Sequence, residues 1–378
     1  KLMKTAYPNY SKIDEVLYYL AYEHEQAGDL TNARKVYFEL IEKAPKSPYI
    51  PNAYLAFGEL FFQEAQGDPA KWDLAAAAYK EVIKYPAPDN KVYGFARYKL
   101  GYVHWNKTEY TDSMNEFKKV IEYGDQYSAL PNATQLAKSA RRDLIPVYAA
   151  SGQPDRAFNF FKPLSGDKGG EQAKTLDMLN ELGLAYIDTG KYKEGIGLYR
   201  DLLSRDKGPR NCHYQTQITM ATQAMKSSDK DGIKKELDTQ LAMRNSFVKE
   251  SHPADKKLEC ANRTAELLSE SAMAWHLEAV GSGGVRGTGD KKTMDLAAYL
   301  YKKVAENFNR DEFNKFEFPR IVKSDWPSLY KIKYAMADLL YFQQRWEECG
   351  PAFDSVVAED PKGESAAEAA YASVLCYQ

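Results

Sequence analysis

The sequence has no long hydrophobic run and no marked excess of charge of either sign. No apolar stretch approaches the roughly 18 to 20 residues that a helix needs to span a bilayer, so we expect no transmembrane helix. The 51 basic residues nearly balance the 53 acidic residues. This balance gives no electrostatic support for binding to nucleic acid or to an anionic membrane surface.

Cysteine and histidine are also scarce, with four and five residues among 378. The cysteines form no CxxC pair and no Cys/His cluster of the kind that holds zinc. We favour separate buried thiols, because cysteine packs like a small apolar residue. Two disulfides are the alternative, since Cys212 and Cys260 begin neighbouring predicted first helices, and Cys349 and Cys376 lie in consecutive repeats. Disulfides would indicate an oxidising compartment such as a periplasm.

No stretch has the pattern of a catalytic or cofactor site. The glycine-rich segment 281–289 is the only one comparable to a phosphate-binding loop, but Asp290 follows its last glycine where that loop requires lysine. We interpret the segment as a mobile connector. No Ser/His/Asp or Cys/His motif accompanies the scattered histidines. We therefore expect no enzyme activity, no cofactor and no metal.

What the sequence does contain is a recurring pattern of two helices. In residues 95–122, apolar residues recur at helical spacing on either side of a short polar turn. Gly101 of the first segment and Ser113 of the second are small, and Phe117 lies one turn after Ser113. The spacing predicts an antiparallel helix hairpin whose axes approach closely at these small residues.

This pattern resembles the tetratricopeptide repeat, a 34-residue unit with the signature W-x2-L-G-x2-Y, then A-x3-F, then P. Similar segments recur over nearly the whole chain. The resemblance implies an all-α, right-handed superhelical solenoid of about eight hairpins and a partial ninth. The expected parts are a five-unit array at 1–207, a degenerate helical unit at 208–256, and further units at 257–378 with insertions at 281–292 and 309–328.

The resemblance also implies that the first helices line a concave groove for a protein partner. The residues expected to face this groove are Tyr18, Tyr22, Phe62, Tyr98, Tyr102, Trp105, Tyr334, Asp338 and Tyr341. We expect Tyr98, Tyr102 and Trp105 to form one exposed ridge, although such rings can also pack between adjacent first helices. The basic and asparagine residues with which chaperone-binding relatives grip an acidic peptide are absent from the matching positions. A partner segment of mixed character, extended or helical, is therefore expected.

The sequence thus predicts a non-catalytic scaffold for protein–protein interaction. Long units with irregular insertions look like bacterial cell-envelope members of the superfamily, and residues 324–353 resemble tetratricopeptide proteins of the myxobacterial adventurous gliding machinery. That resemblance implies a periplasmic adaptor in a multiprotein envelope complex, with the cytoplasm as the alternative location and with self-association open. The alternative function is the substrate-binding arm of a larger cell-wall-active enzyme whose catalytic domain lies outside this sequence.

Overall fold

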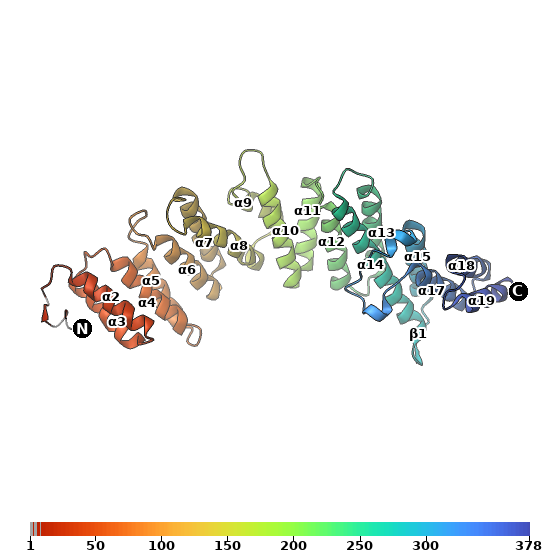
Figure 1. Ribbon diagram of the computed structural model, residues 1–378, viewed down its shortest axis with the longest axis horizontal. Coiled ribbons are helices and arrows are strands. Elements are labelled where there is room, and N and C mark those ends of the chain that lie inside the picture. Colours follow the sequence, from red (N-terminus) through yellow and green to blue (C-terminus); the bar gives the residue numbers. More distant parts are fainter. Residues whose placement is uncertain (1–2, 4–5, 8) are drawn as a thin grey trace. The chain divides into compact units, whose positions relative to one another are not determined.

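The computed structural model describes residues 3, 6–7 and 9–378, which form helix hairpins along most of their length (Figure 1). The chain divides into two compact units, residues 1–185 and 186–378, with the boundary inside α10. The first unit contains α2 (Ile13–Gln26), α3 (Leu30–Lys43), α4 (Ile50–Glu64), α5 (Lys71–Val82), α6 (Tyr93–Asn106), α7 (Tyr110–Gln126), α8 (Ala133–Ser151), α9 (Pro154–Phe161) and most of α10 (Ala173–Asp188). Among the described residues, no helix is both long and apolar enough to cross a bilayer.

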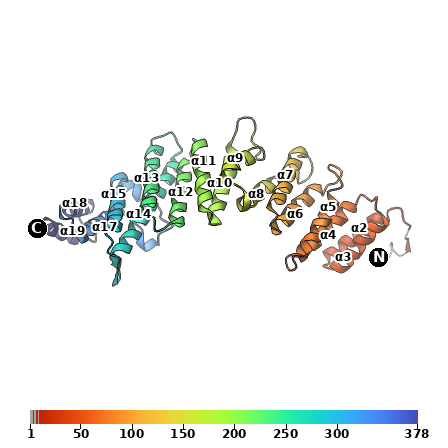
Figure 2. The same cartoon turned by 180° about the vertical axis from the view of Figure 1, so that it is seen from behind.

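The second unit contains the longest helix and the irregular segments. Its elements are α11 (Tyr192–Arg205), α12 (Asn211–Met225), α13 (Lys230–Phe247), α14 (Ala254–Val280), β1 (Gly281–Ser282), β2 (Val285–Arg286), α15 (Lys291–Asn307), α16 (Arg310–Phe313), the 3-10 helix η1 (Lys323–Asp325), α17 (Leu329–Phe342), α18 (Trp346–Glu359) and α19 (Ala366–Tyr377). Within each unit, most consecutive helices lie side by side (Figures 1 and 2). The all-α hairpin fold predicted from the sequence is confirmed. The three-part grouping of the repeats stays a prediction.

The two helices of a hairpin approach closely where a glycine faces an aromatic ring. A Cβ atom on Gly58 of α4 would clash with the ring of Tyr79 on α5, and Gly101 of α6 lies against the ring of Phe117 on α7. The buried hydroxyl of Ser113 donates to the carbonyl oxygen of Gly101 at 2.8 Å. The small residues therefore let the two helices approach closely, as the spacing in residues 95–122 predicts.

Buried tyrosines link the helices of a hairpin through hydrogen bonds to carboxylates. The Tyr37 hydroxyl of α3 donates to Glu25 of α2 at 2.9 Å, and the Tyr79 hydroxyl of α5 donates to Glu59 of α4 at 2.5 Å. Burial, together with the neighbouring carboxylate, raises the pKa of both phenols, so they stay protonated donors. Each ring thus fills the interface and satisfies its own polar group.

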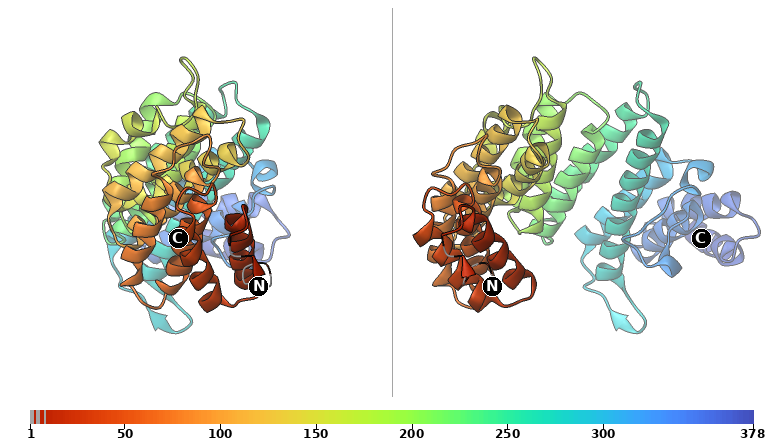
Figure 3. Two further views of the ribbon diagram at one scale, coloured as in Figure 1. Left: turned by 90° about the vertical axis from the view of Figure 1, so that its left-hand side faces the viewer. Right: turned by 60° about the vertical axis from the view of Figure 1, so that its left-hand side comes forward.

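The glycine-rich segment after α14 is ordered, in contrast to the expected mobile connector. Gly281 pairs with Arg286, and Ser282 pairs with Val285, in a short antiparallel hairpin that extends beyond the end of α14 (Figure 3). The turn consists of Gly283 and Gly284, which have φ angles of +61° and +84°. Glycine suits this turn because L side chains rarely adopt such angles.

The insertion at 309–328 belongs to the hydrophobic core of the second unit. Phe313, Phe316 and Phe318 are each at most 4% exposed and contact one another, with ring centroids 5.4 to 6.5 Å apart. Phe308, at the end of α15, packs against Phe313 and Phe316. The insertion is therefore fixed by its aromatic side chains and holds a defined position beside α14.

Replacing Gly58 with alanine tests the close approach of α4 and α5. The Tyr79 ring is fully buried and has no free space to move into, so we expect the free energy of unfolding to fall by about 1 to 3 kcal/mol. The matched control is Gly197→Ala in the middle of α11, where the new Cβ meets nothing within 4 Å. That control should raise stability by about 0.5 to 1 kcal/mol through helix propensity. Urea denaturation followed by circular dichroism measures both, and equal effects would contradict the prediction.

Candidate partner-binding surfaces

The aromatic ridge predicted on α6 is packed between helices in the structure. Tyr98, Tyr102 and Trp105 are each only partly exposed. The rings of Tyr98 and Tyr102 meet the buried ring of Phe117 edge to face, at 5.7 and 5.5 Å between centroids, and Trp105 stacks on Tyr102 at 5.8 Å. The expectation of one exposed ridge is therefore wrong, because these rings fill the space beside α7 and α8.

Asp143 of α8 holds two of these rings in place. The hydroxyls of Tyr98 and Tyr102 both donate to Asp143 Oδ2, the latter at 2.6 Å, and Arg142 Nε donates to Asp143 Oδ1 at 2.8 Å. Burial alone would raise the pKa of Asp143, but these three donors outweigh it and lower the pKa below its ordinary value. The carboxylate is therefore ionised at neutral pH and joins α6 to α8.

The other predicted residues of the first unit divide between packing and exposure. Tyr18 stacks on Tyr49, at the start of the next hairpin, with ring centroids 4.7 Å apart. Phe62 meets Trp72 edge to face at 5.0 Å and lies under the ammonium of Lys99. Tyr22 is 42% exposed. Of these three predicted residues, Tyr22 is the most exposed.

The predicted residues of α17 also divide between packed and exposed side chains. Tyr334 and Tyr341 contact the buried ring of Phe353 on α18, with centroids 6.0 and 6.4 Å apart. Burial, with a hydrogen bond to Glu368, raises the pKa of Tyr334 to about 12. Asp338 is exposed. The nine predicted residues therefore do not form a continuous aromatic stripe, and their role in binding a partner stays a prediction.

A histidine and two carboxylates meet at the turn between α6 and α7. His104 Nδ1 lies 2.6 Å from Glu109 Oε2, with Asp112 close by. The ammonium of Lys107 lies 2.7 Å from the other oxygen of Glu109 and competes with any metal cation there. In the first hairpin His24 contacts Asp29 in the same way, at 3.1 Å. We therefore interpret this contact as a link between the two helices of a hairpin.

A groove that the sequence did not reveal lies between α12 and α14, the first helices of two consecutive hairpins. Its volume is about 650 Å³, and its lining includes four cations, Arg210, Lys256, Arg263 and Arg320, with the single carboxylate of Glu259. His213 also lines it, and burial lowers the pKa of this imidazole. The positive charge of the groove at neutral pH therefore comes from its arginines and lysine.

Two of the carboxylates that balance these cations are buried. Glu266 has no exposed side-chain surface, accepts Arg263 Nη1 at 2.7 Å and accepts the backbone N–H of Arg320 at 2.9 Å. Asp206, also buried, accepts Arg210 Nε at 3.0 Å. Arg263 and Arg210 thus lie over buried carboxylates, whereas Lys256 pairs with the exposed Glu259.

The structure contains two disulfides in place of the separate thiols that we favoured. Cys212 of α12 is bonded to Cys260 of α14, with 5.7 Å between their Cα atoms, and both residues line the groove. Cys349 of α18 is bonded to Cys376 of α19. The first bridge joins helices of neighbouring hairpins, so it fixes their separation at the floor of the groove.

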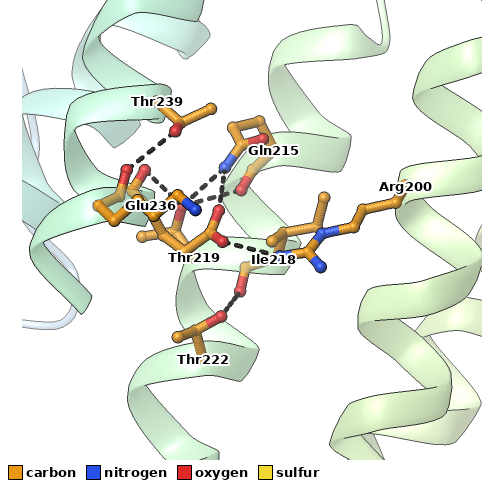
Figure 4. A network of polar contacts seen from close by, with 8 residues as sticks. Arg200, Gln215, Ile218, Thr219, Thr222, Glu236 and Thr239 are labelled. Atoms are coloured by element: carbon orange, nitrogen blue, oxygen red, sulfur yellow. Dashed lines mark hydrogen bonds and ion pairs between the residues drawn. The ribbon is translucent and has the colours of Figure 1, made fainter. Parts of the chain in front are cut away.

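Buried polar residues replace apolar ones in the hairpin of α12 and α13. Glu236 of α13 accepts from Arg200 of α11 at 2.8 Å and from Gln215 of α12 at 3.1 Å (Figure 4). Thr219, fully buried on α12, donates to the carbonyl oxygen of Gln215 at 3.0 Å. Polar residues stand here at positions where the repeat signature has apolar ones, so the sequence matches the signature poorly. The hydrogen bonds nevertheless hold the two helices together as a hairpin.

The insertion at 309–328 runs along α14 beside the groove. The Asn262 side chain donates to the carbonyl oxygen of Glu317 at 2.6 Å and accepts from the backbone N–H of Glu317 at 2.8 Å. Arg320 pairs with Glu270, one turn beyond Glu266, at 3.0 Å. Side chains on one face of α14 thus bind the backbone of the insertion, which is not helical at these residues.

A second, apolar hollow lies between α14 and α17. Its volume is about 430 Å³, and its lining includes Met273, Leu277, Ile332 and Ala335. Leu277 is 56% exposed. The two recesses place a cationic surface and an apolar surface along the same helix.

Comparison with known proteins supports a repeat of helix hairpins. Residues 15–47, which include α3 and most of α2, match the family described as Tetratricopeptide repeat. No curated protein matches the chain.

Solved structures give only distant similarities. The apo form of the quorum sensor NprR from B. thuringiensis is 12% identical, with a TM-score of 0.32, over 92% of this chain and 87% of that chain. The TPR domain of P58(IPK) is 12% identical, with a TM-score of 0.23, over 96% and 98%. A tetratricopeptide repeat protein from Parabacteroides merdae is 12% identical, with a TM-score of 0.25, over 84% and 98%. Similarities with TM-scores this low assign neither an overall shape nor a partner to the chain.

Replacing both Tyr98 and Tyr102 with phenylalanine tests the contact with Asp143. The rings remain but the two hydroxyl donors are lost, so we expect the free energy of unfolding to fall by about 1 to 3 kcal/mol at neutral pH. Because the folded-state pKa of Asp143 is lowered, its contribution is present above the ordinary pKa and lost as the pH falls through the lowered value. The difference between wild type and variant should therefore shrink in acid.

Chemical denaturation at a series of pH values measures this difference. Tyr22→Phe, at a partly exposed ring, is the control and should leave stability unchanged. A difference that stays constant down to strongly acidic pH would contradict the role assigned to Asp143.

Replacing both Cys212 and Cys260 with serine tests the bridge at the floor of the groove. The bridge joins residues 48 apart, so its loss should lower the free energy of unfolding by about 2 to 4 kcal/mol. The comparison variant replaces Cys349 and Cys376, which are 27 apart, and should lose somewhat less. Thiol titration of the denatured wild-type protein should find no free sulfhydryl, whereas four free sulfhydryls would contradict both bridges.

Proposed function

We propose that the chain is a non-catalytic scaffold that binds segments of protein partners along α14 in its second unit. The observation that carries this proposal is the pair of recesses on that helix, the cationic groove shared with α12 and the apolar hollow shared with α17. A partner segment with both acidic and apolar residues matches this pair. Stacked hairpins suit the role because they hold such surfaces on rigid helices.

The insertion at 309–328 supports this choice of surface. Pro319 and Arg320 border the cationic groove, and Asp325 and Pro327 border the apolar hollow. Since the phenylalanines of the insertion are buried in the core and Trp326 packs edge to face on Phe318, both borders are already in place before a partner binds. Preformed borders reduce the entropy lost on binding.

We also propose that the protein works in an oxidising compartment, with a bacterial periplasm as the first candidate. The support is the two disulfides, which rarely persist in a reducing cytoplasm. The finer assignment, an adaptor in a bacterial envelope complex such as the gliding machinery, rests on the resemblance seen in the sequence and stays a proposal.

Site-specific photo-cross-linking tests the scaffold proposal. A photoreactive amino acid at Gln217, which lines the cationic groove, should give covalent adducts with one or a few proteins in the native host. The same amino acid at Lys235, an exposed residue of α13, is the matched control and should give none of these adducts. Mass spectrometry of the adducts identifies the partners. Identical adduct patterns at the two positions would refute binding in the groove.

A further inference from the structure

The groove between α12 and α14 presents four cations and one carboxylate, Glu259, on its surface, and keeps two balancing carboxylates, Glu266 and Asp206, below. The side chains of Arg263 and Lys256 are 43% and 45% exposed, whereas that of Glu266 is fully buried. Lys256 pairs with Glu259 at 2.8 Å. Because this ion pair is exposed, Lys256 can exchange Glu259 for a carboxylate of a partner at little cost in free energy. A group entering from solvent therefore meets a surface on which cations outnumber carboxylates by four to one.

The first turns of two helices add to this positive surface. The cap residues of α12 and α14 are Arg210 and Pro253, and neither makes a side-chain capping hydrogen bond. Cys212 and His213, in the first turn of α12, and Lys256, in the first turn of α14, line the groove. Helix N-termini favour anions because their backbone N–H groups and their dipole point outward.

The length of the groove indicates how much of a partner chain fits. The disulfide holds Cys212 and Cys260 at a Cα separation of 5.7 Å, so the two helices are in contact at the floor and a partner lies along the groove above it. The lining residues of α12 extend from Cys212 to Met220, a rise of about 12 Å. An extended chain covers that length with about four residues.

The adjacent face of α14 already holds a chain of this form. Asn262, one residue before the groove residue Arg263, makes two hydrogen bonds to the backbone of Glu317 in the insertion. An amide side chain that pairs with both backbone groups of one residue holds a segment irrespective of its sequence. We propose that the groove between α12 and α14 binds an extended acidic segment of a protein partner.

This proposal rests on the scaffold function proposed above and specifies the chemistry of the partner. The sequence argument against an acidic partner concerned positions in the first and third repeats, where tyrosines stand. The cations of the groove come instead from α12, α14 and the insertion. Acidic side chains of the partner would contact Lys256 and Arg263, with the α12 N-terminus and Arg210 at one end of the groove.

Fluorescence anisotropy with short labelled peptides tests the proposal. One peptide alternates glutamate and serine, and its counterpart alternates glutamine and serine, with both ends blocked. We expect the wild-type protein to bind the glutamate peptide at least about tenfold more tightly, with affinity that falls as salt is added. Equal binding of the two peptides would overturn the proposal.

Matched variants locate the binding. K256E/R263Q removes the two most exposed cations and keeps, in place of the Arg263 guanidinium, an amide that can still donate to Glu266. K226E/K235Q makes the same change in net charge at exposed lysines outside the groove. The first should weaken binding of the glutamate peptide by about tenfold, and the second should retain most of it. Equal losses would show only a net-charge effect and overturn the assignment.

Two further measurements keep the outcomes distinct. Should K256E/R263Q fail to fold by circular dichroism, Lys256→Gln against Lys235→Gln gives the same comparison without disturbing Arg263. Cross-linking at Gln217 without any preference for the glutamate peptide would leave the scaffold function standing and refute the acidic partner.

Discussion

The structure depends on tyrosine rings that fill helix interfaces and bond their hydroxyls to carboxylates. Gly58 and Glu59 show the arrangement most simply, because the glycine makes room for the Tyr79 ring and the next residue accepts its hydroxyl. In the second unit, the fully buried Tyr214 of α12 donates its hydroxyl to Asp206, at the end of α11, at 2.9 Å. A buried phenol without an acceptor would cost free energy, so the carboxylate also fixes how one helix lies along the other.

This use of tyrosine explains why α6 offers little open aromatic surface. Rings that would otherwise face a partner are tied to the next helix, as Tyr98 and Tyr102 are tied to Asp143. Two chemically distinct surfaces lie where the repeat pattern is interrupted. Around α14, buried polar residues, a disulfide and an insertion replace regular packing, and both recesses lie there.

The sequence predicted the fold well because its signal is local and repeated. Gly101, Ser113 and Phe117 lie within one hairpin, and helical spacing alone brings them together. The surfaces were not predictable in this way, since Asp143 is 41 residues from Tyr102 and lies in another hairpin. The cationic groove was harder still, because it combines residues from a repeat of uncertain register with residues of an insertion. The cysteine pairing stayed open for the same reason, since α12 has no clear repeat register.

The burial of Glu266 has a consequence for binding at the groove. A carboxylate without solvent contact needs strong donors, and Arg263 together with the backbone N–H of Arg320 supplies them. Arg263 is therefore held in one position while nearly half of its side chain remains open to solvent. The disulfide holds the two helices at a fixed separation in the same way. Folding has already ordered the Arg263 side chain and the two helices. Binding here therefore costs less conformational entropy than binding at flexible surface lysines, so each charge of the groove contributes more to the affinity.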